Sequence, residues 1–91
     1  MKIYIAGKIP NDPNYRRKFD KEASLLKSNG HIVLNSAILP KGMAHHEYMH
    51  ICFAMIDFAD CIYFLPCWKD SKGAVMEYEY AQQNGKPCKE I

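Results

Sequence analysis

Apolar positions fall into two patterns along this chain: short continuous runs, and longer stretches in which they recur every three or four residues. Three short runs predict strands, at residues 2–6, 32–34 and 61–65, and residues 86–91, after the last helix, are expected to form a final short strand. Three longer stretches predict helices, at residues 14–29, 47–58 and 71–84. Strands and helices therefore alternate from one end of the chain to the other.

This alternation predicts the fold class. Strand–helix repeats of this kind are typical of a parallel α/β sheet with right-handed crossovers. The run CIYFL at residues 61–65 has no polar position, which is typical of a strand covered on both faces. We expect one domain, residues 1–91, with a flavodoxin-like (Rossmann-like) three-layer architecture. Its four parallel strands are expected in the order 2-1-3-4, with three helices.

The second predicted helix is apolar on two sides. One stripe holds Ile51, Met55 and Phe58, and the other holds Met49, Phe53 and Ile56. A helix of this kind needs two packing partners. One is the sheet, and the other is expected to be a second copy of the chain, which predicts a homodimer or a larger homo-oligomer.

Composition narrows the protein class. The chain has 91 residues and a formal charge of +2, which fits one domain and gives no reason to expect a nucleic-acid partner. No apolar run has the length of a membrane helix, and the first ten residues reach Gly, Lys and Pro too early for a signal peptide. The four Cys include no C-x-x-C, so free thiols are expected. These features predict a cytoplasmic protein.

A ligand site is expected where the strand order reverses, beyond the carboxyl ends of strands one and three. This topology brings Gly7 and Lys8 close to Ser71 and Gly73. Glycine lets a ligand approach the backbone, Lys8 offers a positive charge, and the free N–H groups at the start of the third helix favour an anion. Neither G-x-x-x-x-G-K-[ST] nor G-x-G-x-x-G is present, and no metal or cofactor is expected.

Glu77 is the most informative residue of the third helix. Ala74, Glu77, Tyr78 and Ala81 share one helical stripe, whereas Glu79 points away from it. A carboxylate on an inward stripe is costly unless it is paired or has a chemical task. The pattern alone leaves both readings open, a functional carboxylate or a structural ion pair.

Three segments together resemble a known superfamily. The segments are IYIAGKI at the start, Ala-Asp before the third strand, and SKGAVMEYEYA in the third helix. They resemble the nucleoside 2-deoxyribosyltransferase superfamily, which includes nucleoside 5′-monophosphate N-glycosidases. Over almost its whole length, the chain is more closely similar to a small phage and bacterial domain family of unassigned function related to those enzymes.

The resemblance implies roles for individual residues. Glu77 corresponds to the nucleophile that attacks the anomeric carbon of the sugar, and Tyr4 to a tyrosine that orients this carboxylate. Gly7 and Lys8 match the first phosphate-contacting loop, and Ser71 matches a serine that holds the 5′-phosphate. Lys8 together with Ser71 thus favours a phosphorylated ligand over a free nucleoside.

Lys8 replaces a serine of the monophosphate hydrolases, and one further departure from the superfamily matters for catalysis. Cys52 stands where an aspartate is usual, and a thiol is no equivalent hydrogen-bond acceptor unless its pKa is strongly lowered. Together with Cys52, His50 and Trp68 are candidate contacts for the base or sugar, and Trp68 fits an oligomer contact equally well. Two functions stay open. One is an enzyme that cleaves the base–sugar bond through Glu77. The other is a non-catalytic module that sequesters or senses a nucleotide-derived signal, such as a phage protein acting against host defence.

Overall fold

Four parallel strands form the central sheet in the order β2-β1-β3-β4 in the computed structural model, which describes all residues from 1 to 91. The strands are β1 (Lys2–Ala6), β2 (Ile32–Asn35), β3 (Cys61–Phe64) and β4 (Cys88–Glu90). The helices are α1 (Tyr15–Ser28), α2 (His45–Phe58) and α3 (Lys72–Gln83), with short 3-10 turns at Ser36–Ile38 and Trp68–Asp70. The predicted fold class, strand order and helix number are confirmed.

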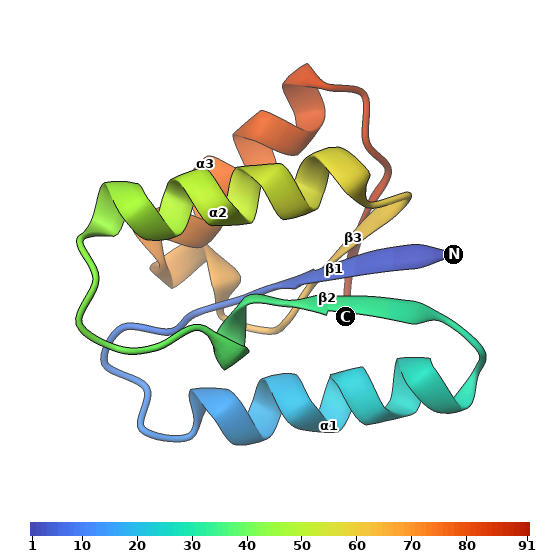
Figure 1. Cartoon of the computed structure of the whole chain (residues 1–91), viewed down its shortest axis with the longest axis horizontal. Helices are drawn as coiled ribbons and strands as arrows, with labels where there is room; N and C mark the ends of the chain where they lie inside the picture. The colour runs from blue at the N-terminus through green and yellow to red at the C-terminus, as the bar shows by residue number, and fades with distance from the viewer.

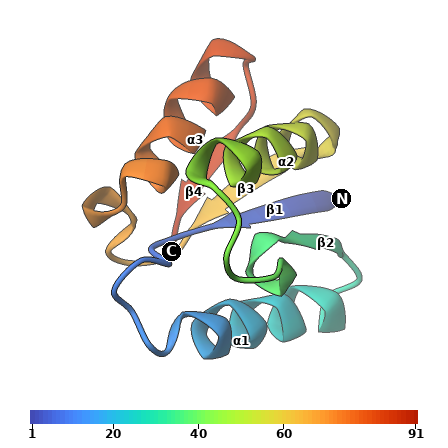
Figure 2. The same cartoon turned by 60° about the vertical axis from the view of Figure 1, so that its left-hand side comes forward.

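The helices cover the two faces of the sheet unequally. Helix α1 lies on one face, whereas α2 and α3 lie side by side on the other (Figures 1 and 2). Strand β1 runs through the middle and sends alternate side chains to the two sides. Ile3 and Ile5 pack with Phe19 of α1, while Tyr4 packs with Ile56 of α2. Tyr4 therefore points to the side that α2 and α3 cover.

Local hydrogen bonds determine where α2 begins and shape the segment that follows β2. Helix α2 begins at His45, two residues before the predicted start, because the Glu47 carboxylate accepts a hydrogen bond from the Ala44 N–H at 2.8 Å. The expected turn after β2 contains a 3-10 turn, in which the Asn35 side chain accepts from the Ala37 N–H at 2.9 Å. None of the helices has the length and apolar character that crossing a membrane requires.

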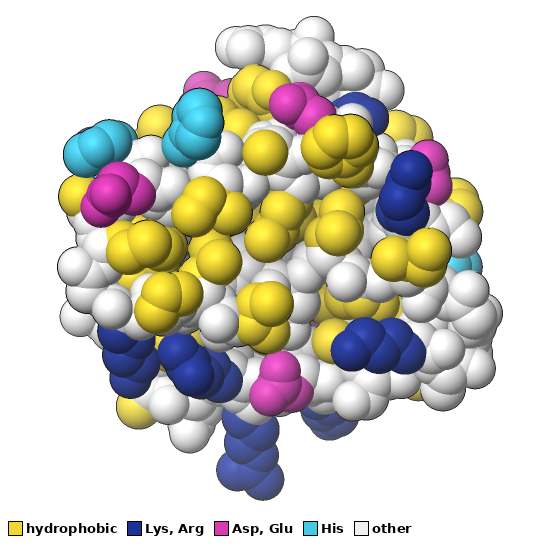
Figure 3. Space-filling view, in the orientation of Figure 1, with side chains coloured by type: hydrophobic (Ala, Val, Ile, Leu, Met, Phe, Trp, Pro, Cys, Tyr) yellow, Lys and Arg dark blue, Asp and Glu magenta, His cyan; other side chains and the backbone are white.

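The second apolar side of α2 is partly covered within the chain. The Phe53 ring stacks on Tyr80 of α3 with centroids 4.2 Å apart, and the Tyr80 hydroxyl donates to Asp57 at 2.6 Å. Phe58, the last residue of α2, is by contrast 70% exposed, and Ile38, in the 3-10 turn after β2, is 72% exposed. In the view of Figure 3, hydrophobic side chains are spread over the middle of the face that includes α2, and several Lys and Arg side chains lie along the edge toward α1. The homo-oligomer stays a prediction, supported by fewer residues of α2 than the sequence suggested.

Candidate functional site

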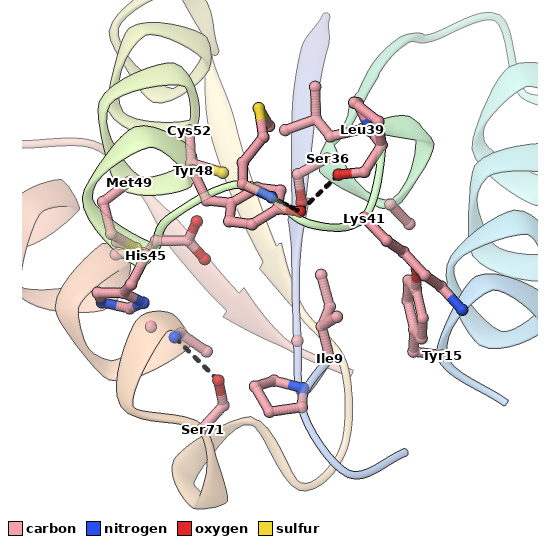
Figure 4. Close-up of a pocket in the computed structure, with 18 of the residues that line it drawn as sticks. Ile9, Tyr15, Ser36, Leu39, Lys41, His45, Tyr48, Met49, Cys52 and Ser71 are labelled. Atoms are coloured by element: carbon pink, nitrogen blue, oxygen red, sulfur yellow. Dashed lines mark hydrogen bonds between the residues drawn. The ribbon is translucent and has the colours of Figure 1, made fainter. Parts of the chain in front are cut away.

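A cavity of about 430 Å³ opens between the carboxyl end of the sheet and the first turns of α2 and α3 (Figure 4). Its walls come from four segments, within residues 7–10, 36–43, 45–52 and 71–77, and from Tyr15 at the start of α1. This volume falls in the range of roughly 300–1,000 Å³ that small-molecule sites occupy. The cavity lies beyond the carboxyl ends of the strands, as expected, but the segment after β2 forms more of it than the loop after β3.

Glu77 lies in this cavity, and it is the one buried charged side chain of the protein, with 5% of its surface exposed. The Tyr4 hydroxyl donates a hydrogen bond to its Oε2 at 2.5 Å. No Lys, Arg or His nitrogen lies within 4.0 Å of the carboxylate, since Lys18 and Asp12 form the only such pair. The structural ion pair that the sequence left open is therefore absent.

Burial sets the charge state of Glu77. It raises the pKa of the carboxyl group from 4.5 to about 7, although hydrogen bonds from Tyr4 and Cys52 act in the opposite direction. The group is thus close to half ionised at neutral pH. A carboxyl group tuned in this way inside a cavity is typical of functional sites.

Tyr4 contacts the Glu77 carboxylate from strand β1. It lies on β1, opposite Ile62 of β3, and none of its side chain is exposed. Burial, followed by the nearby negative charge of Glu77, raises its pKa well above the ordinary value. The phenol consequently keeps its proton and donates a hydrogen bond to Oε2, a contact in keeping with the position that the resemblance implies for it.

Cys52 faces the same carboxylate from α2. Burial, followed by the negative charge of Glu77, raises the pKa of the thiol to about 11. The group is therefore a neutral thiol at physiological pH and a weak hydrogen-bond donor. Glu77 is the only acidic side chain that lines the cavity, so no second carboxylate is available there.

Ser71 and the start of α3 form one end of the cavity. The Ser71 Oγ accepts a hydrogen bond from the Ala74 N–H at 3.3 Å, which caps the helix and leaves the hydroxyl proton free to be donated. A side chain at Gly73 would come into ordinary contact with Met49 and His45, at 3.6 and 3.7 Å. Ser71 and Gly73, both predicted as site residues, line this end of the cavity.

Gly7 also lines the cavity, but packing on the opposite side of the sheet explains why no side chain is present. A Cβ there would lie 3.1 Å from Leu65 and 3.2 Å from Phe19. These distances are too short for comfortable contact between carbon atoms. The glycine allows α1 to approach the end of β1, in addition to any close approach by a ligand.

Three predicted binding residues, Lys8, His50 and Trp68, lie outside the cavity. The Lys8 side chain is not part of its wall, although Gly7 and Ile9 on either side of it are. Its charge acts on Asp12, whose pKa is lowered chiefly by a hydrogen bond from Lys18 and further by Lys8. His50 is exposed on the outer side of α2.

Helical spacing along α2 explains why His50 does not line the cavity. His45, Tyr48, Met49 and Cys52 recur at helical spacing and line the cavity, whereas His50 lies between them in sequence and on another side of the helix. His45 is therefore the histidine of the site. No three His, Cys, Asp or Glu side chains lie close enough together to hold a metal ion.

Trp68 is a core residue and neither a base contact nor an exposed oligomer contact. Only 7% of it is exposed, and its ring lies 4.7 Å from that of Phe64 and 5.0 Å from that of Tyr78. Its indole N–H donates to Glu90 at 2.9 Å. The 3-10 turn after β3 directs the side chain onto the sheet, away from the cavity.

Several cavity residues were not identified from the sequence, among them Tyr15, Lys41 and Tyr48. Tyr15 lies on the apolar stripe of the first helix, a pattern that predicts packing, and Lys41 lies in the turn sequence LPKG. The Pro-Lys-Gly sequence was the available signal, because Gly42 adopts φ +99° in a turn that brings Lys41 to the cavity.

Comparison with protein-family models identifies the family of this chain. A family model described as "Domain of unknown function (DUF4406)" matches residues 1–90. No curated protein matches the chain.

Proposed function

Since this chain belongs to the family described as a domain of unknown function (DUF4406), we propose a function from its site. The protein cleaves the base–sugar bond of a nucleoside or deoxynucleoside 5′-monophosphate, with Glu77 as the nucleophile. The observation that carries the proposal is a buried carboxylate without a cationic partner, held by Tyr4 inside a cavity of small-molecule size. A relationship to the nucleoside 2-deoxyribosyltransferase superfamily is part of this proposal.

The geometry of Glu77 suits nucleophilic attack. Tyr4 occupies Oε2, so Oε1 is the oxygen available to the substrate. A bond forms between Oε1 and the anomeric carbon, the bond from that carbon to the base nitrogen breaks, and its electron pair leaves with the base. Water then displaces the carboxylate from the glycosyl ester in a hydrolase, and a second base does so in a transferase. The positive charge that develops on the sugar stabilises the ionised form of Glu77.

The phosphate is proposed to bind at the Ser71 end of the cavity. Ser71 offers a hydroxyl proton, and the first N–H groups of α3 are free of helical partners, which favours an anion. Gly73 leaves the backbone of this turn accessible. Because Lys8 lies outside the cavity, the preference for a phosphorylated ligand rests on Ser71 and α3.

Cys52 favours a second candidate function. A thiol with a pKa of about 11 neither carries a negative charge nor accepts a proton at neutral pH, so it gives a sugar hydroxyl or a departing base little assistance. The cavity would then bind a nucleotide or a nucleotide-derived signal without cleaving it. A homodimer or larger assembly is proposed for either function, with the exposed Phe58 and Ile38 as its candidate contacts.

A ligand panel distinguishes the two functions. The protein is incubated with ribonucleoside and deoxyribonucleoside 5′-monophosphates, the free nucleosides, cyclic nucleotides and NAD, and free base is measured by chromatography. We expect base release from a 5′-monophosphate, and a slower release from the matching free nucleoside. Intact ligand that raises the melting temperature would favour the binding module. Neither base release nor a thermal shift with any compound would contradict both functions.

A further inference from the structure

The proposed function assigns no role to the cavity wall that lies opposite Ser71. Lys41 and Tyr15 lie together on one side of the cavity, across from His45 and Ser71 (Figure 4). The Lys41 ammonium lies 6.0 Å from the centroid of the Tyr15 ring. This wall combines an aromatic surface and a cation, whereas the Ser71 end offers a hydroxyl and backbone N–H groups.

Hydrogen bonds from two helices hold the segment that carries Lys41. From α2, the Tyr48 hydroxyl donates to the Pro40 carbonyl at 2.5 Å and accepts from the Met43 N–H at 3.2 Å. One side chain therefore bridges the two ends of the turn that contains Lys41, as Figure 4 shows. The position of this turn is fixed before a ligand binds, which reduces the cost of binding.

From α1, Arg16 connects the same segment to Tyr15. Its Nε donates to the Tyr15 hydroxyl at 2.8 Å, and its Nη2 donates to the Leu39 carbonyl at 3.4 Å. The guanidinium carbon also lies 5.6 Å from the centroid of the Tyr15 ring. The aromatic ring and the turn are thereby held as one wall.

Lys41 is the only Lys or Arg that lines the cavity. No carboxylate oxygen lies within 4.0 Å of its ammonium, so the charge is free to act on a ligand. The cavity therefore holds one carboxylate, Glu77, and one ammonium, Lys41, on walls formed by different parts of the chain. A substrate bound between them would have one reacting group next to the Glu77 carboxylate and another next to the Lys41 ammonium.

We propose that Tyr15 and Lys41 form the base subsite and that Lys41 stabilises the departing base; this rests on the proposed function. The phosphate lies at Ser71 and the anomeric carbon at Glu77, so the base extends toward the opposite wall. Tyr15, Ile9 and Leu39 provide the apolar surfaces that a planar heterocycle packs against.

The proton balance of this step is complete. When the bond to the sugar breaks, its electron pair goes to the base nitrogen, and the Lys41 ammonium donates a proton to the base. The base leaves neutral, and Lys41 becomes an amine. In the second half of the reaction, water attacks the glycosyl ester, Glu77 leaves as a carboxylate, and the proton released from water restores the ammonium.

The test compares leaving groups. 7-Methylguanine leaves its nucleotide as a neutral molecule, so it needs no proton from the protein, whereas guanine does. Lys41→Met is expected to lower kcat for guanine release by about 100-fold, within the range of acid–base catalysis. Its effect on 7-methylguanine release is expected to stay below about threefold, since no charge develops on that base. For a pyrimidine-specific enzyme, uracil replaces guanine and the less basic 5-fluorouracil replaces 7-methylguanine, with a smaller loss for the latter.

Lys27→Met removes the same charge from the exposed last turn of α1 and serves as the control, with both rates unchanged. Equal losses for the two leaving groups in Lys41→Met would overturn the inference, because phosphate binding or structural damage affects both substrates alike. Unchanged rates for both would also overturn it. If the wild-type protein releases no base from any nucleotide, the proposed function fails, and this inference with it.

Discussion

Glu77→Gln is expected to lower the rate of base release by 10³-fold or more, on the order of the loss seen when a nucleophile is removed from an enzyme. Glutamine keeps the shape of the side chain, and its amide oxygen still accepts the hydrogen bond from Tyr4. It has no ionisable oxygen to attack the anomeric carbon. The measurement is base release by chromatography, under the conditions in which the wild-type protein is active.

Glu79→Gln is the matched control for this variant. Glu79 lies two residues further along α3 and is exposed, and it is not part of the cavity wall. The same chemical change there should leave the rate within about twofold of wild type, as for surface substitutions away from a site. A Glu77→Gln protein that keeps the wild-type rate would exclude Glu77 as the nucleophile.

The stability of the folded protein is expected to fall by about 3 kcal/mol between pH 4.5 and pH 8, because the carboxyl group of Glu77 is harder to ionise when folded. Its pKa is about 7 in the folded protein and 4.5 when unperturbed, a difference that corresponds to about 3 kcal/mol. Between these values the unfolded chain has lost the proton and the folded chain keeps it. Raising the pH thus favours unfolding until both states are ionised, above about pH 7.

Urea unfolding of wild type and Glu77→Gln at pH 4.5 and pH 8 measures this effect. The variant lacks the ionising group, so its free energy of unfolding should change less with pH than that of wild type, by about 3 kcal/mol. Tyr4 and Cys52, which face Glu77, stay protonated in this range because their pKa values are raised. Parallel pH profiles for the two proteins would contradict the burial account of Glu77.

Much of the fold and the centre of the site were predictable because they depend on repeating patterns. The apolar runs fixed the strands, and right-handed crossovers left few strand orders. The helical period placed Ala74, Glu77 and Ala81 on one inward stripe, and all three are buried. The contact between Tyr4 and Glu77, 73 residues apart, followed from the resemblance and the topology together.

The remaining site residues depend on loop geometry, which has no period. Trp68, in the turn after β3, packs on the core because that turn directs it inward, and composition gives no sign of this. Lys8 and Lys41 each stand beside a glycine, at Gly7 and Gly42, yet only Lys41 lines the cavity. The difference comes from the hydrogen bonds that Tyr48 makes to the turn around Lys41.

Trapping of the glycosyl ester is the most direct test of Glu77 as a nucleophile. A 2-fluoro substituent on the sugar slows the formation and breakdown of oxocarbenium-like transition states, so a 2′-deoxy-2′-fluoroarabino nucleotide of the base released in the panel should accumulate the covalent intermediate. Intact mass measurement is predicted to show one added sugar phosphate per chain, and peptide mapping to place it on Glu77. The adduct should be absent in Glu77→Gln. Base release without any adduct, or an adduct on another residue, would contradict the account.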